Sequence, residues 1–342
     1  MKKQIIGIGD IHLRSKGFYR LGISRFFNWI DKTLPSSEKE FTEILLAGDV
    51  LNKVTMLPEA AGLAVKLLKL LKTKASKVYI ILGNHDYGLS NYKVISSKKF
   101  LCEEDNVVVI DTLCEYTTDL GFKLLCLPWC YGMKHSDVDA YVAQLPKDAS
   151  YDVCTAHWEL ESCMGSDFIN LRVNAKAFMC GHIHSHKVNP YYLGSVLPNS
   201  IAEQKDDDPS ILRYFIRDDK GDSVKDVEIP SFVHIETVTI GNLGDIAQYT
   251  GHPDIFYKII HPKTIAGRDI KSQARISGVL VYETEKLETE TTKKEIRDVD
   301  DVPEYRVQTH KDILNSCKEK LQLDQDTYDL CMRTIEIVDQ AS

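Results

Sequence analysis

Short apolar runs alternate with helix-like segments along the first part of the chain. Each run holds four or five residues, the length of a short buried strand, and most runs end at a glycine, a proline or a polar residue. The runs are residues 5–8, 44–47, 78–82, 107–110, 124–127, 153–156 and 177–180. Apolar residues at helical spacing lie between them, in residues 26–34, 60–71 and 138–145. This alternation predicts a layered α/β or α+β domain.

The pattern changes after residue 190. Strand-like runs at 191–193, 211–216 and 224–229, with turn residues at 206–209 and 218–222, are typical of antiparallel hairpins. Pro230 then marks a candidate boundary. The first domain is therefore predicted to cover residues 1–230.

A smaller αβ pattern fills residues 231–285. Strand-like runs at 235–240, 255–260 and 279–282 surround a polar helix-like stretch near Ile270, which predicts a small second domain. Residues 286–303 are charged and hold few apolar side chains, so they are predicted to form a solvated linker.

Residues 304–342 regain helical periodicity and predict two amphipathic helices. An amphipathic helix needs a surface that covers its apolar face. This helix pair either packs on the small domain or docks on a partner protein. The charged linker before it favours a partner.

Composition and charge restrict the function only weakly. The chain has 342 residues, 43% of them hydrophobic, as in an ordinary globular protein. Its net charge is -8, and the acidic excess is concentrated after residue 230, where 20 acidic and 14 basic side chains lie. Nucleic-acid-binding proteins usually carry a basic surface. Charge alone therefore argues against nucleic acid, and any DNA contact must be local, shared with a partner or carried by bound metal.

Cysteine usage and hydropathy indicate a cytoplasmic protein without a membrane segment. The nine cysteines lack the repeated close pairs of a zinc ribbon and are predicted to be free thiols in a reducing compartment. The apolar stretch after Met1 is too short for a signal peptide. No later segment approaches the roughly 20 apolar residues that a membrane-spanning helix requires.

Histidines and carboxylates gather in five short blocks, each at the end of a strand-like run. The blocks are Gly9-Asp10-Ile11-His12, Gly48-Asp49, Gly83-Asn84-His85-Asp86, Ala156-His157-Trp158 and Gly181-His182-Ile183-His184. Alone, a Gly-Asp pair is more often a turn, and a single histidine is more often a hydrogen-bonded residue than a ligand. Together, the blocks are expected to meet at one sheet edge. Mixed imidazole and carboxylate donors suit divalent transition metals, and a shared carboxylate can bridge two of them, so the blocks predict a two-metal phosphoesterase centre.

The five blocks resemble the signature motifs of the calcineurin-like metallophosphoesterase superfamily. The layout of the whole chain is similar to the SbcD-type nuclease subunits of double-strand-break repair complexes, and most of all to the phage-encoded recombination exonuclease subunits. This resemblance implies a four-layer αββα sandwich with a small αβ capping domain. It also implies that residues 304–342 bind an SbcC-type SMC-like ATPase, and that the nuclease forms a homodimer and, with the ATPase, a heterotetramer.

The resemblance also implies a role for each residue of the blocks. The first metal ion is expected to bind Asp10, His12, Asp49 and His184, and the second Asp49, Asn84, His157 and His182. Manganese is the expected metal, with magnesium as the alternative. His85 is expected beside the scissile phosphate, oriented by Asp86. Arg14 and Tyr19 follow the first block closely, and we interpret them as candidate contacts to the DNA backbone.

The sequence therefore predicts a manganese-dependent DNA nuclease of repair, recombination and replication. It is expected to act as an exonuclease on double strands and an endonuclease on single strands. Two alternatives stay open at this point. The first is a phosphatase or nucleotide phosphodiesterase with the same fold. The second is a scaffold without catalytic activity, which is disfavoured because no ligand position is missing.

Overall fold

The computed structural model describes residues 2–14, 18–53, 58–90, 93–101, 105–160, 168–198, 208–252 and 255–287. The chain divides into two compact units, Met1–Lys286 and Leu287–Ser342. Apart from Lys286 and Leu287, the predicted linker and the predicted C-terminal helices lie outside the described residues. The first unit mixes helices and strands, which confirms the predicted α/β class.

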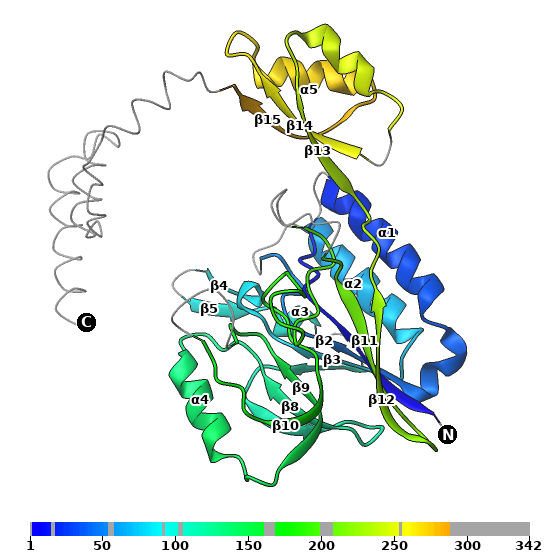
Figure 1. The fold of residues 1–342 in the computed structure, drawn as a ribbon, viewed down its shortest axis with the longest axis vertical. Helices are drawn as coiled ribbons and strands as arrows, with labels where there is room; N and C mark the ends of the chain where they lie inside the picture. The colour runs from blue at the N-terminus through cyan, green and yellow to red at the C-terminus, as the bar shows by residue number, and fades with distance from the viewer. Residues whose placement is uncertain are drawn as a thin grey trace, which may run out of the picture. The chain divides into compact units, whose positions relative to one another are not determined.

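A six-stranded sheet forms the centre of the first unit (Figure 1). Its strands lie in the order β12 (Gly221–Glu228), β11 (Ile211–Asp218), β1 (Lys3–Ile8), β2 (Thr42–Leu46), β3 (Lys77–Ile81) and β6 (Val107–Ile110). The four strands from β1 to β6 run parallel, whereas β11 pairs antiparallel with β1 and with β12. The predicted turn at 218–222 joins the β11–β12 hairpin.

A four-stranded sheet packs against it. Its strands lie in the order β10 (Asn174–Phe178), β9 (Ser150–Ala156), β8 (Lys123–Leu127) and β7 (Cys114–Thr117). The first three run parallel, and β7 is antiparallel to β8. The predicted strand at 191–193 is wrong: Tyr192 forms only an isolated bridge with Cys180, because the chain turns directly before it and takes a positive φ angle of 79° at Gly194 soon after.

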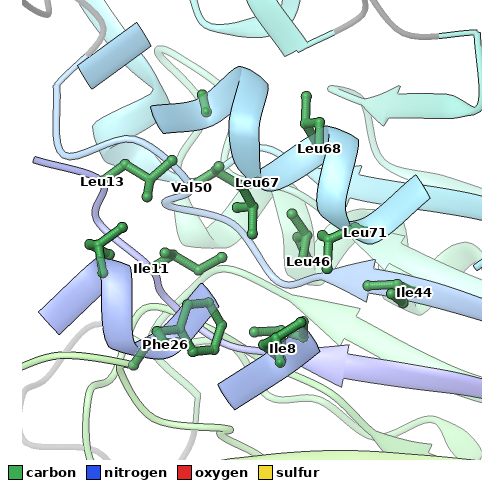
Figure 2. Close-up of a cluster of buried hydrophobic side chains, with 14 of the residues drawn as sticks. Ile8, Ile11, Leu13, Phe26, Ile44, Leu46, Val50, Leu67, Leu68 and Leu71 are labelled. Atoms are coloured by element: carbon green, nitrogen blue, oxygen red, sulfur yellow. The ribbon is translucent and has the colours of Figure 1, made fainter. Parts of the chain in front are cut away.

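Alternating side chains place each sheet between two apolar layers. In β1, Ile5 points into the cluster between the sheets, while Ile6 and Ile8 face the cluster under α1 (Phe18–Thr33) and α2 (Pro58–Lys72). Figure 2 shows Phe26 and Leu67 from these helices meeting Ile8 and its neighbours on the sheet. A third cluster fills the space between the second sheet and α4 (His135–Gln144). The layers thus run helix, sheet, sheet, helix.

Several short elements escaped the sequence pattern. They are η1 (Ser36–Phe41), η2 (Asn84–Asp86), β4 (Tyr87–Ser90), β5 (Lys93–Ser96) and α3 (Lys98–Leu101). Most span only three or four residues, too few for a hydrophobic period to repeat. Helix α1 also begins eight residues before its predicted start. Tyr19, Leu21 and Ile23 pack on the core at every second position, which is not the spacing of three or four residues that predicts a helix.

Residues after Pro230 form a three-stranded parallel sheet with its own apolar cluster. The strands are β13 (His234–Thr239), β14 (Ile255–His261) and β15 (Leu280–Lys286), accompanied by η4 (Leu243–Tyr249) and α5 (Gly267–Ile276). Phe232, Val233, Ile235 and Phe256 join the cluster around α1 instead. The capping role and the boundary at residue 230 stay predictions. Among the helices of the described residues, none is long and apolar enough to cross a membrane.

Candidate metal centre

The five blocks follow the ends of five parallel strands from the two sheets. Asp10, Asp49 and Asn84 come after β1, β2 and β3, whereas His157 and His182 come after β9 and β10. Parallel strands present their following loops at one edge of a sheet. Here the two edges face each other, and three overlapping groups of side chains have ligand atoms within 4.8 Å of one another. These groups are Asp10, His12 and His184; His12, Asp49 and His85; and Asp10, Asp49 and His157.

Unusual backbone conformations aim these side chains at one another. His12, Asp49 and His182 have φ angles of 48°, 46° and 89°, and in the described part of the chain they are the non-glycine residues with positive φ. Such angles are unfavourable for residues with a Cβ atom and occur mainly at functional sites. Backbone hydrogen bonds hold them: the amide nitrogen of His12 donates to the carbonyl oxygen of Asp49 at 2.9 Å.

Two of the glycines that precede candidate ligands make room for another ligand. A Cβ atom on Gly83 would lie 2.1 Å from Asp49 Oδ1, and one on Gly48 would lie 2.2 Å from His157 Nδ1. Both distances are far below contact distance. The Gly-Asp and Gly-Asn pairs are therefore a packing requirement of this site as well as turns.

The first ligand group consists of Asp10, His12 and His184 together with Asp49. The Nε2 atoms of His12 and His184 lie 3.0 Å apart, and His12 Nε2 lies 3.7 Å from Asp49 Oδ2. Asp10, His12 and Asp49 are almost completely buried.

The second ligand group consists of Asn84, His157 and His182 together with Asp49. Asn84 Oδ1 lies 3.2 Å from His157 Nε2 and 3.1 Å from His182 Nδ1. The Oδ2 atom of Asp49 lies 3.3 Å from His157 Nε2, so this oxygen lies between the two groups. Neighbouring ligands of an octahedral ion with bonds of about 2.1 Å are separated by about 3 Å. The spacing and the nitrogen and oxygen donors thus fit two divalent cations that share Asp49.

Burial and charge set the protonation of the ligands. Burial lowers the pKa of His12 to about 2, so its ring is neutral and keeps a lone pair for a metal ion. Burial also raises the pKa of Asp10. Burial acts against the charged form of His157 as well, but the nearby Asp49 outweighs it and raises the pKa of His157 to about 10. Burial likewise opposes the charge of Asp49, yet His157 and His12 bring its pKa below the usual range. A cation at this place would replace the proton on His157.

A family model described as calcineurin-like phosphoesterase matches residues 3–186, which include all five blocks. The chain belongs to the calcineurin-like phosphoesterase family. Its members bind two divalent metal ions and hydrolyse phosphoesters. No curated protein sequence matches the chain. A solved glutamine-dependent NAD+ synthetase from Acinetobacter baumannii, in complex with adenosine diphosphate, is similar over 100% of this chain and 73% of its own. Its identity of 9% and TM-score of 0.29 are too low to show a shared fold or function.

His85 of this phosphoesterase lies beside the first ligand group but is held from the backbone. Its ring centroid lies 4.9 Å from that of His12, and its Nδ1 atom lies 2.9 Å from the carbonyl oxygen of Asn52. Asp86 was expected to orient this ring. Its contacts are instead with the amide nitrogens of Gly83 and Leu51, at 3.0 and 3.2 Å. Asp86 therefore fixes the loop that carries His85, and the Asn52 carbonyl faces the ring.

Two further contacts support the ligands of the phosphoesterase site. His157 Nδ1 lies 2.8 Å from the carbonyl oxygen of Ala47, which leaves Nε2 for the second ligand group. His182 Nε2 lies 2.7 Å from Glu159 Oε1. The hydrogen bond from His182 lowers the pKa of Glu159 to about 2. Glu159 lies outside the five blocks, and its one signal in the sequence is its place two residues after His157.

Arg14 and Tyr19, which follow the first block in the sequence, contact each other. The guanidinium carbon of Arg14 lies 4.1 Å from the centre of the Tyr19 ring, in a cation–π contact. Their predicted contact with DNA stays a prediction.

Proposed function

We propose that this phosphoesterase is a manganese-dependent DNA nuclease, the nuclease subunit of an SbcCD-like repair and recombination complex. It acts as an exonuclease on duplex DNA and as an endonuclease on single strands. The observation that supports a polymeric substrate is the three-stranded unit β13–β15, which follows the phosphoesterase core and has its own apolar cluster. A phosphatase of small substrates does not need such a unit.

The two ligand groups would bind the metal ions, and the metal ions would bind the phosphate. Bound cations would lower the pKa of a water molecule and neutralise phosphate oxygens. The first ligand group would hold one cation and the second ligand group the other, with Asp49 shared. The Ala47 carbonyl keeps the His157 ring in the tautomer that presents Nε2.

His85 is the residue placed to assist the leaving 3′ oxygen. Because Nδ1 faces the Asn52 carbonyl, this nitrogen carries the proton, and Nε2 is the atom left to act on substrate. A protonated Nε2 can donate its proton to the oxygen as the phosphorus–oxygen bond breaks. General-acid assistance of this kind typically contributes ~10²- to 10⁴-fold in rate.

A cleavage assay on end-labelled DNA tests the substrate class. Duplex and single-stranded DNA are incubated with the full chain and manganese or magnesium, beside a phosphopeptide and a cyclic nucleotide. We expect shortened DNA products with manganese and little turnover of the two small substrates. Hydrolysis of the phosphopeptide or cyclic nucleotide in preference to DNA would favour a phosphatase or nucleotide phosphodiesterase.

We further propose that residues 304–342 bind the ATPase subunit. Deletion of residues 300–342 is expected to abolish co-purification with an SbcC-type ATPase and to leave cleavage by the nuclease alone unchanged. Retained co-purification would contradict this role. Equilibrium sedimentation of the full chain tests the expected homodimer, which should become a heterotetramer when the ATPase is added.

A further inference from the structure

Glu159 lies between two histidines from different parts of the fold. It follows β9 and stands outside all five blocks. Its Oε1 atom lies 2.7 Å from His182 Nε2, and its Oε2 atom lies 2.9 Å from Nε2 of His135, the first residue of α4. An ionised carboxylate only accepts hydrogen bonds, so both ring nitrogens are the donors. Glu159 therefore links a residue of the second ligand group to a helix outside the site.

This contact determines which nitrogen of His182 is free. A neutral imidazole carries one N–H group, and donation to Glu159 places it on Nε2. The lone pair then lies on Nδ1, the atom that faces Asn84 Oδ1 at 3.1 Å. His182 can thus act as a ligand only through the nitrogen directed at the second ligand group. A carboxylate behind a ligand histidine also makes the ring a stronger electron donor.

His135, which contacts the second carboxylate oxygen of Glu159, is itself held by a buried tryptophan. The His135 ring packs edge-on against Trp158, with centroids 5.2 Å apart and an interplanar angle of 74°. Trp158 is buried, and its Nε1 atom donates to the carbonyl oxygen of Pro128 at 3.0 Å. His135 therefore holds the second carboxylate oxygen in place while the first receives His182.

We propose that Glu159, supported by His135, is a positioning residue that sets the tautomer and direction of His182 for the second metal ion. The proposal rests on the proposed metal-dependent function. Its effect is confined to the second ligand group because the backbone of His182 has a separate anchor. The amide nitrogen of His182 donates to both carboxylate oxygens of Asp10, at 3.0 and 3.1 Å. Loss of Glu159 would release the ring and leave this backbone contact intact.

Manganese titration of the full-length chain tests the proposal without any DNA. Calorimetry and electron paramagnetic resonance give the number of bound ions and the affinity of each site. We expect two ions per wild-type chain. In Glu159→Ala one site should weaken ~10- to 100-fold, the range for loss of such supporting contacts, while the other changes less than twofold. Glu159→Gln should fall in between, because its amide oxygen still accepts a hydrogen bond but carries no charge.

Glu115→Ala is the matched control. Glu115 also accepts one strong hydrogen bond, from the Tyr151 hydroxyl at 2.6 Å, but lies in β7 away from the ligand groups. The Glu115→Ala variant should bind both manganese ions with wild-type affinity. If Glu159→Ala does not fold, the comparison of Glu159→Gln with wild type decides.

Three results would overturn the proposal. They are unchanged affinity at both sites of the folded variants, equal weakening of both sites, and fewer than two ions on the wild-type chain. Because the probe is manganese alone, two-site binding without DNA cleavage would reject the nuclease function and leave the role of Glu159 standing.

Discussion

The Nε2 atoms of His12 and His184 lie 3.0 Å apart, although 172 residues separate them in the chain. Burial lowers the pKa of His12, so its ring is neutral and only one of its two nitrogens carries a proton. A cation placed between them would accept both lone pairs at once. Such an ion would replace the contact between the two ring nitrogens by two metal–nitrogen bonds.

Removal of metal should lower the stability of the protein. A ligand that binds only the folded state stabilises it by ~2.7 kcal/mol at a free concentration of 100 Kd. We expect a rise in Tm by several degrees when manganese is added to chelator-treated protein, measured by scanning fluorimetry. Asp49→Ala, which lacks the shared carboxylate, should show little of this rise. An equal rise in both proteins would place the stabilising ions elsewhere.

Substitution of His85 should separate catalysis from metal binding. His85→Ala is expected to bind two manganese ions and to lose ~10²- to 10⁴-fold in turnover, because the proposed role of its side chain is to assist the leaving group. Asp49→Ala is expected to lose both properties. Calorimetry gives the metal content and DNA cleavage gives the turnover. Equal loss of metal in the two variants would contradict this division of roles.

A single methyl group at Gly83 should damage the site. In Gly83→Ala the new Cβ atom would lie 2.1 Å from Asp49 Oδ1, so the carboxylate must move and manganese binding should weaken at both sites. Gly62→Ala in α2 is the control, because a Cβ atom there meets nothing within 4 Å. That change should keep metal binding and raise stability by ~0.5 to 1 kcal/mol through higher helix propensity. Unchanged manganese affinity in Gly83→Ala would show that the loop can shift without cost.

Glu43 should give the protein a pH-dependent stability away from the metal centre. Its side chain is fully buried in β2, where burial raises the pKa of the carboxyl group. An acid with a raised folded pKa destabilises the protein above that pKa, and the penalty disappears as the pH falls towards the unfolded value of about 4.3. Glu43→Gln removes the ionisation. The Tm of Glu43→Gln minus that of wild type should therefore increase with pH from about 4.3 up to the raised pKa of Glu43, and stay constant above it. A difference that is constant with pH would show that Glu43 has no such effect.

The sequence predicted which side chains gather at the candidate site better than it predicted their surroundings. A buried strand followed by Gly-Asp or Gly-Asn is a local pattern, so Asp49 and Asn84 could be found by inspection. The Asn52 carbonyl behind His85 and the carboxylate of Glu159 behind His182 could not, because each contact depends on how separate loops meet. Every residue has a backbone carbonyl group, so the sequence does not show which carbonyl contacts a given side chain. The same limit explains why Asp86 was expected at the His85 ring when it binds the loop backbone instead.

Both ligand groups take side chains from both sheets. In the first, His184 follows the four-stranded sheet while its companions follow the six-stranded one, and in the second His157 and His182 face Asn84 and Asp49 in the same way. A bound ion would thus cross-link the two halves of the sandwich, as a disulfide would. Unlike a disulfide, this cross-link could be removed by a chelator. Contacts of such long sequence separation cost chain entropy to close. Because each ligand group needs both sheets in place, metal uptake should follow the pairing of the two sheets, and a chelator should weaken that pairing first.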